Sequence, residues 1–146
     1  MVAGEKQTIE KVLEEKGVYV CVVSGNSMLP LLRDRQDTVV LRPKKQRLNV
    51  LDVALYKAQD NYVLHRVIKV LEDGYVMRGD NTYLNEIVKE EAVFGVLEGF
   101  YRDGEYFSVI DKKCVKYAKK WIKSYSLRHF KFRLKKSVYK IFHSGR

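Results

Sequence analysis

The sequence has few of the residues that build disulfide frameworks or metal centres. Its two cysteines, Cys21 and Cys114, lie far apart and do not have the spacing of metal ligands. A disulfide framework is therefore not expected, and a reducing compartment is the simpler interpretation. No cofactor or metal is expected either.

Long apolar segments are also missing. No uninterrupted apolar run approaches the roughly 18 residues that a membrane-spanning helix needs. The first 17 residues carry acidic side chains and lack the apolar core of a secretory signal. The expected location is therefore cytoplasmic, or peripheral on the membrane.

Acidic residues are missing from one part of the chain. Positions 112–146 contain 13 Lys and Arg residues and no Asp or Glu. Positions 1–111 hold the other 15 basic residues and all 18 acidic ones, so the net charge of +10 comes from the tail. The surface that uses this positive charge to bind a partner is therefore expected in the tail and not in the body.

The residues that are present divide the chain into three segments. Residues 5–16 have a helical apolar period and end at Gly17, which predicts an N-terminal helix within positions 1–17. Short runs rich in Val, Tyr and Leu predict strands across 18–111, with tight turns at Asp73-Gly74 and Asp103-Gly104. The helical period returns in 112–146, where Ser124–Ser126 separates two predicted helices. We therefore expect a mainly antiparallel β domain with a short N-terminal helix and a basic helical tail.

The stretch "SGNSMLP" at positions 24–30 contains a candidate nucleophile. A serine hydroxyl needs a base within hydrogen-bond reach and donors for the oxyanion that forms on attack. Ser27 follows a predicted strand, and its own N–H is a candidate oxyanion donor. Gly25 permits close approach of a substrate. These features are also compatible with an ordinary turn, so a catalytic role for Ser27 depends on whether the sequence also supplies a base.

The candidate base is His65 in "YVLHRVIKV". Side chains alternate along a strand, which places Val63, His65 and Val67 on one face. Apolar neighbours favour the neutral imidazole that accepts a proton. A third residue would orient the ring, and "MRGDNTYLNE" offers both Asp80 and Glu86. Both stay candidates, with a slight preference for Asp80.

Four segments in order carry a more specific resemblance: "SGNSMLP", "LNVLDVALYK", "YVLHRV" and "RGDN". Over roughly residues 18–97 the chain resembles the type I signal peptidase superfamily, which includes the LexA-like self-cleaving repressors. The resemblance implies that Ser27 is the nucleophile of an S-M-x-P motif that Met28 completes. The bacterial enzymes and the repressors use a Lys as base. The endoplasmic-reticulum and archaeal type uses a His in an H-R-V segment, which His65 matches.

The resemblance also extends to the acidic residues and to the function. The "GDN" segment matches positions 79–81, and an acid six residues after Asp80 corresponds to Glu86. The fold implied is that of the signal-peptidase and LexA-like β domain. The activity implied is that of a serine endopeptidase that cuts a leader or precursor peptide after small residues, in shallow apolar pockets.

Two other functions compete with this one. A LexA-like regulator would cleave itself and bind DNA, but only about 17 residues precede the β segment and leave no room for a DNA-binding domain there. The base position also holds His65 and not Lys, and the Ala3-Gly4 bond lies at the extreme N-terminus. The other alternative is a catalytically inactive peptide-binding module that keeps the fold.

The basic tail has three interpretations. Aromatic residues interleaved with Lys and Arg favour an amphipathic helix on an anionic membrane surface. A basic stripe also suits nucleic acid, which we consider the less favoured partner. In the third interpretation the helix packs its apolar face on the body and leaves a solvated charged face. A peptide or protein substrate and an anionic membrane are thus the expected partners.

Overall fold

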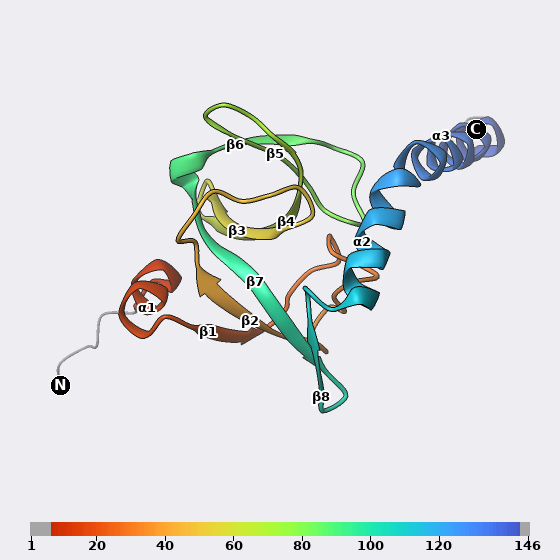
Figure 1. Ribbon diagram of the computed structural model, residues 1–146. Helices are drawn as coiled ribbons and strands as arrows, with labels where there is room; N and C mark the ends of the chain where they lie inside the picture. The colour runs from red at the N-terminus through yellow and green to blue at the C-terminus, as the bar shows by residue number, and fades with distance from the viewer. Residues whose placement is uncertain (1–6, 144–146) are drawn as a thin grey trace, which may run out of the picture.

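The structure is a computed structural model that describes residues 7–143. It confirms a mainly antiparallel β domain with one short helix before it and two helices after it (Figure 1). The elements are α1 Ile9–Lys16, β1 Tyr19–Val22, β2 Thr38–Pro43, β3 Val53–Ala58, β4 Asn61–Val70, β5 Gly74–Arg78, β6 Glu86–Lys89, the 3₁₀ turn η1 Glu90–Ala92, β7 Val93–Arg102, β8 Glu105–Ser108, α2 Lys112–Lys123 and α3 Tyr125–His143.

The strands form one curved sheet in which neighbouring strands are antiparallel. Their order is β1-β2-β7-β3-β4-β5-β6, and β8 adds to β7 as a hairpin. Sheet twist and three register shifts, at Val40/Leu41, Leu55/Tyr56 and Val67/Lys69, contribute to the curvature of the sheet (Figure 1). The strand β1 forms one edge of the sheet and β6 the other.

Two hydrophobic clusters lie on the two faces of the central strand β3. Because side chains alternate along a strand, Val53 and Leu55 enter one cluster, whereas Ala54 and Tyr56 enter the other. All four of these residues are buried. Both faces of β3 are therefore in the core, which fixes the register of the hairpin that β3 forms with β4.

The helix α1 begins later than the sequence predicts. Its start is set by Thr8, whose side chain accepts a hydrogen bond from the Lys11 N–H at 3.3 Å and so caps the first turn. Its end is as predicted, because Gly17 takes a left-handed conformation and its N–H bonds to Leu13. The predicted helical residues 5 and 6 lie outside the described residues.

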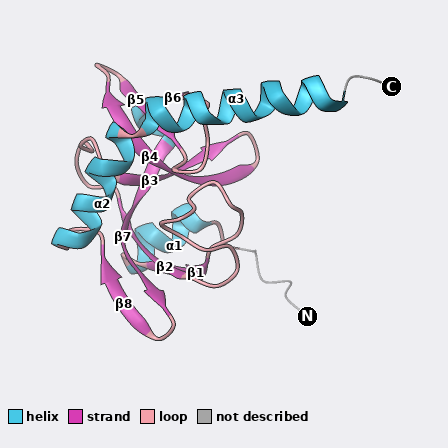
Figure 2. Cartoon of the chain, turned by 90° about the vertical axis from the view of Figure 1, so that its right-hand side faces the viewer, coloured by secondary structure: helices cyan, strands magenta, loops and turns pink. Residues whose placement is uncertain are grey.

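The two C-terminal helices are separated at Ser124, as the sequence predicts. The helix α2 packs on the β domain through Ala118, which is buried. The helix α3 runs out from the domain, and both views show its C-terminal half clear of the sheet (Figures 1 and 2). Within residues 7–143, no helix is both long enough and apolar enough to cross a membrane.

Candidate active site

The candidate nucleophile lies in the loop between β1 and β2. Met28 is buried in the core and anchors this loop, whereas Ser27 is half-buried and lines a pocket of about 350 Å³. Gly25 has a φ of +100°, a conformation that side-chain-bearing residues rarely adopt, and its N–H donates to Asp34 Oδ1 at 2.7 Å. The Gly25 N–H is therefore occupied. In contrast, the Ser27 N–H has no acceptor within residues 7–143.

The candidate base, His65, lies on β4 and is held from one side. Its Nδ1 is 3.0 Å from the hydroxyl oxygen of Tyr56, and the Tyr56 hydroxyl donates in turn to Glu86 Oε2. The carboxylate oxygen itself is 4.0 Å from His65 Nδ1. Because the Tyr56 proton is given to Glu86, the Tyr56 oxygen is the acceptor for an N–H on Nδ1. This assigns the neutral tautomer in which Nε2 carries the free lone pair.

Burial keeps this imidazole neutral. His65 is 7% exposed, and desolvation lowers its pKa, whereas the charges of Glu86 and Asp80 act in the opposite direction. Burial and the hydrogen bond to Glu86 raise the pKa of the Tyr56 hydroxyl, which therefore keeps its proton. The hydrogen-bond chain from Glu86 through Tyr56 to His65 is thus stable in one proton arrangement at neutral pH.

The free nitrogen of His65 lies near the serine loop. An added Cβ on Gly79 would stand 3.1 Å from His65 Nε2 and 2.6 Å from the Ser27 carbonyl oxygen. Only glycine fits between these two groups without displacing the serine backbone. The next residues join the loops, because the Asn81 N–H donates to the Ser27 carbonyl at 2.8 Å and the Asn81 side chain donates to the Asn26 carbonyl at 3.1 Å.

The Ser27 hydroxyl and the His65 imidazole share a pocket but do not form a hydrogen bond with each other in the described chain. The pocket is lined by five of the six candidate residues, namely Gly25, Ser27, Met28, His65 and Glu86. The sixth, Asp80, is not part of the lining. The structure therefore brings the candidate nucleophile, the candidate base and one of the two candidate acids to the same pocket.

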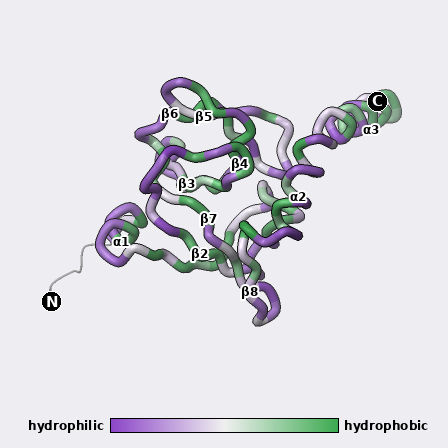
Figure 3. Tube along the Cα trace, viewed as in Figure 1, coloured by the Kyte–Doolittle hydropathy of each residue, from purple (hydrophilic) through white to green (hydrophobic). Residues whose placement is uncertain are grey.

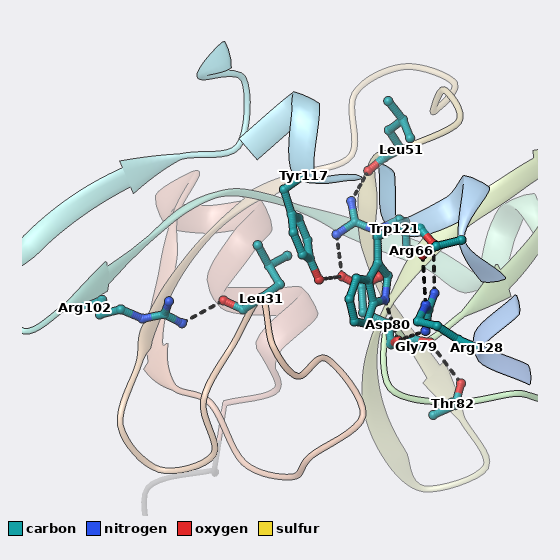
Figure 4. A network of polar contacts seen from close by, with 11 residues as sticks. Leu31, Leu51, Arg66, Gly79, Asp80, Thr82, Arg102, Tyr117, Trp121 and Arg128 are labelled. Atoms are coloured by element: carbon teal, nitrogen blue, oxygen red, sulfur yellow. Dashed lines mark hydrogen bonds and ion pairs between the residues drawn. The ribbon is translucent and has the colours of Figure 1, made fainter. Parts of the chain in front are cut away.

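Asp80 belongs to a different network (Figure 4). Arg66 grips both carboxylate oxygens at 2.7 Å, and the Tyr117 hydroxyl donates to Oδ2 at 2.9 Å. Arg66 follows His65 directly on β4, so the two side chains point to opposite faces of the strand. The Asp80 carboxylate is thus held away from the imidazole face, and its hydrogen bonds go to Arg66 and Tyr117.

The C-terminal helices contact the backbone of the same loop. The Trp121 indole N–H donates to the Asp80 carbonyl at 2.6 Å, and Arg128 reaches the same oxygen at 3.3 Å (Figure 4). The Tyr125 hydroxyl donates to the Tyr83 carbonyl at 3.0 Å. The tail is therefore attached to the segment that positions Ser27 through Asn81.

Apolar side chains and a free strand edge complete the surroundings of Ser27. The pocket is lined by Ile9, Val23, Val39, Leu41, Leu55, Val63 and Leu64, among others. The strand β1 pairs only with β2, so its other edge is unpaired within the described chain. An extended peptide can add to such an edge and place a side chain in the pocket.

Sequence reasoning missed Tyr56. The signal was present in the register of the β3–β4 hairpin, which pairs Ala54 with His65 and Tyr56 with Val63. Tyr56 is therefore the diagonal neighbour of His65 on the same face of the sheet, within reach of a long side chain. The short connection at Gln59-Asp60 fixes this register, so a hairpin alignment of the sequence would have found the contact.

Comparisons with known proteins add no identification, since no family model and no curated protein matches the chain. Within residues 7–143, no group of three or more His, Cys, Asp or Glu side chains is placed to hold a metal ion.

Proposed function

We propose that the chain is a serine endopeptidase in which Ser27 is the nucleophile, His65 the general base and Glu86 the distal acid. The observation that carries the proposal is the hydrogen-bond chain on His65 Nδ1. It leaves Nε2 unprotonated, beside Gly79 and the serine loop, as a general base for a hydroxyl must be. Tyr56 stands between the acid and the base as a positioning residue.

The proposed reaction uses groups that the site already holds. The Ser27 oxygen attacks the substrate carbonyl carbon while His65 Nε2 takes its proton, and the free Ser27 N–H binds the oxyanion. The carbon–nitrogen bond then breaks, and His65 returns the proton to the leaving amine. Water attacks the acyl ester by the same route and restores Ser27. Catalytic hydrogen bonds commonly tighten only with substrate bound, which suits a Ser27 hydroxyl that shares the pocket without bonding His65.

The proposed substrate is an extended peptide or protein segment with a small apolar residue before the cleaved bond. It pairs with the free edge of β1, whose chain continues directly into the Ser27 loop. We further propose that the chain is related to the type I signal peptidase superfamily, nearest to its Ser/His members. The supporting features are the order of the four sequence segments and the antiparallel β domain that carries Ser27 and His65.

The test is hydrolysis of a peptide library by the full chain, followed by mass spectrometry, with Ser27→Ala beside it. We expect cleavage after small residues, reduced by at least about 10³-fold in Ser27→Ala because the nucleophile is removed. Ser24→Ala is the matched control, since Ser24 lines the same pocket, and it is expected to keep near-normal activity.

Three outcomes would contradict the proposal. Hydrolysis that survives in Ser27→Ala would show that another group carries the reaction. Peptides that are retained but never cut by the unmodified chain would favour the inactive binding module. Cleavage of the chain itself, lost in Ser27→Ala while peptides stay intact, would favour the self-cleaving regulator.

A further inference from the structure

The helix α3 contacts the β domain through one face of its first turns. The Tyr83 ring stacks on Phe132 and His129, with centroid distances of 4.6 and 5.2 Å. Tyr125 and Arg128 reach the Tyr83 and Asp80 carbonyls from the same side. At 100° per residue these four α3 side chains lie within one third of the helix circumference.

Five aliphatic and aromatic side chains of α3 form a stripe on the opposite face. The stripe consists of Leu127, Phe130, Leu134, Val138 and Ile141, which follow the three- and four-residue spacing of one helix face. Their exposed fractions run from 49% for Leu134 to 73% for Ile141, and every residue from 130 to 143 is exposed. Figure 3 shows hydrophobic and hydrophilic positions interspersed along this projecting helix. The stripe therefore does not pack on the β domain, which excludes for α3 the interpretation in which the apolar face of the tail packs on the body.

Basic side chains border this stripe on both sides. Lys131 and Lys135 follow one border, and Arg133 and Lys140 follow the other, as the helical period places them. The helix has no acidic residue between Tyr125 and His143. Long Lys and Arg stems can lie along an apolar surface while their charges stay at its rim.

We propose that α3 docks lengthwise on an anionic lipid surface, with its stripe among the acyl chains and its bordering cations on the lipid phosphates. A lipid surface is the occupant that satisfies both features of α3. Nucleic acid would pair with the cations but leave the stripe in water. A second copy of α3 would cover the stripe but would bring two rows of cations together with no acid between them.

The structure assigns this role to α3 and not to the whole tail. The apolar side of α2 is used against the β domain, where Ala118 is buried and Trp121 bonds the Asp80 carbonyl. The proposal does not depend on catalysis by Ser27. If both hold, a docked α3 keeps the pocket beside membrane-bound precursors, because its first turn is attached to the 80–83 segment.

The experiment is flotation of the full chain with vesicles of phosphatidylcholine alone or mixed with phosphatidylglycerol. We expect at least tenfold more bound protein with the anionic vesicles. The stripe variant carries Leu134→Gln, Val138→Gln and Ile141→Gln. The charge variant carries Lys131→Gln, Lys135→Gln and Lys140→Gln. Both variants are expected to lose most of this binding. Glutamine is used because it is a good helix former, so α3 should stay helical in both variants.

The matched control removes the same charge elsewhere, with Lys11→Gln, Lys45→Gln and Lys69→Gln at exposed positions outside α3. It should float like the unmodified chain, and circular dichroism should show that all variants fold. Three results would overturn the proposal: no flotation, flotation that the stripe variant retains, or loss that the control variant shares.

Sedimentation without lipid that shows a stripe-dependent dimer would assign the face to a second copy. DNA binding lost in the charge variant but kept in the stripe variant, without flotation, would assign it to nucleic acid.

Discussion

Two carboxylates six residues apart flank the candidate base and are held in opposite ways. Asp80 is 4% exposed, and its carboxylate is bonded by Arg66 and by the Tyr117 hydroxyl. The Glu86 side chain is 46% exposed and accepts one hydrogen bond, from Tyr56. The first carboxylate is fully engaged in holding the fold, whereas the second is available to respond to the imidazole.

This difference indicates which acid can assist catalysis. An orienting acid has to favour the imidazolium that forms during the reaction. The charge of Asp80 is already paired with Arg66 in a bidentate contact, so much of its field is cancelled by its neighbour. Among the described residues, Glu86 has no ion-pair partner other than His65. Its negative charge is therefore the one left to stabilise a protonated base.

The largest expected effect is on stability and comes from Asp80→Asn. Arg66 is 4% exposed, and removing its partner leaves a buried charge without compensation. Breaking a buried pair in this way typically costs about 3–5 kcal/mol of the free energy of unfolding. Chemical denaturation monitored by circular dichroism measures the loss.

The comparison variant is Glu86→Gln, which removes a half-exposed carboxylate and keeps an acceptor for Tyr56. We expect it to change the free energy of unfolding by less than about 1 kcal/mol. Equal losses in the Asp80 and Glu86 variants would contradict the division of roles between the two acids.

A second effect, on catalysis, is expected from Glu86→Gln. We expect kcat to fall by about 10- to 100-fold, since the protonated base loses its stabilising charge. The pH profile should also move. Burial holds the pKa of His65 below its ordinary value of about 6.5, so the acid limb of kcat/KM should lie below that pH. The Glu86 charge raises the His65 pKa, so its removal should move the limb to still lower pH.

The control for this shift is Glu91→Gln, which removes an exposed carboxylate five residues along the same segment. It lies outside the hydrogen-bond chain and is expected to leave kcat and the acid limb unchanged. A limb that moves to higher pH in Glu86→Gln, or an equal change in both variants, would show that Glu86 does not act on His65 through Tyr56.

Local patterns in the sequence predicted the helices, the strands and the two central residues of the candidate site. Short runs rich in Val, Tyr and Leu predicted the strands, the helical period predicted both tail helices, and the turn at Asp103-Gly104 forms the β7–β8 hairpin. Ser27 and His65 were identified by residue type and context, and the structure places both in one pocket. These features depend on neighbours in the sequence, which is why the sequence predicts them.

The hydrogen-bond partners of these side chains depend on strand register, so local sequence patterns could not predict them. Asp80 and Glu86 both stay candidates in the sequence, with a slight preference for Asp80, because a sequence does not show that Arg66 pairs with Asp80. Tyr56 was overlooked because its contact with His65 follows from hairpin pairing and not from spacing. The orientation of the α3 stripe likewise depends on which face Tyr83 contacts.

The smallest of these effects is expected from Tyr56→Phe, which deletes the hydroxyl oxygen that links Glu86 to His65. The ring and its packing stay, but the N–H on His65 Nδ1 loses its acceptor and Glu86 loses its donor. We expect kcat to fall by about tenfold, or ~1.4 kcal/mol in the barrier, with KM little changed because the hydroxyl contacts no substrate. Steady-state kinetics on a cleaved library peptide measures both constants.

Tyr62→Phe is the matched control, since Tyr62 lines the same pocket and bonds Glu10, not His65. It should leave kcat near normal. The Tyr56 and Glu86 substitutions should also be less than additive when combined, because each breaks the same hydrogen-bond chain. Full additivity would mean that Glu86 reaches the imidazole across the 4.0 Å gap by charge alone, and that the tyrosine serves only to fill the core. A double-mutant cycle in which the two substitutions are coupled would instead establish that Glu86 acts on His65 through the Tyr56 hydroxyl.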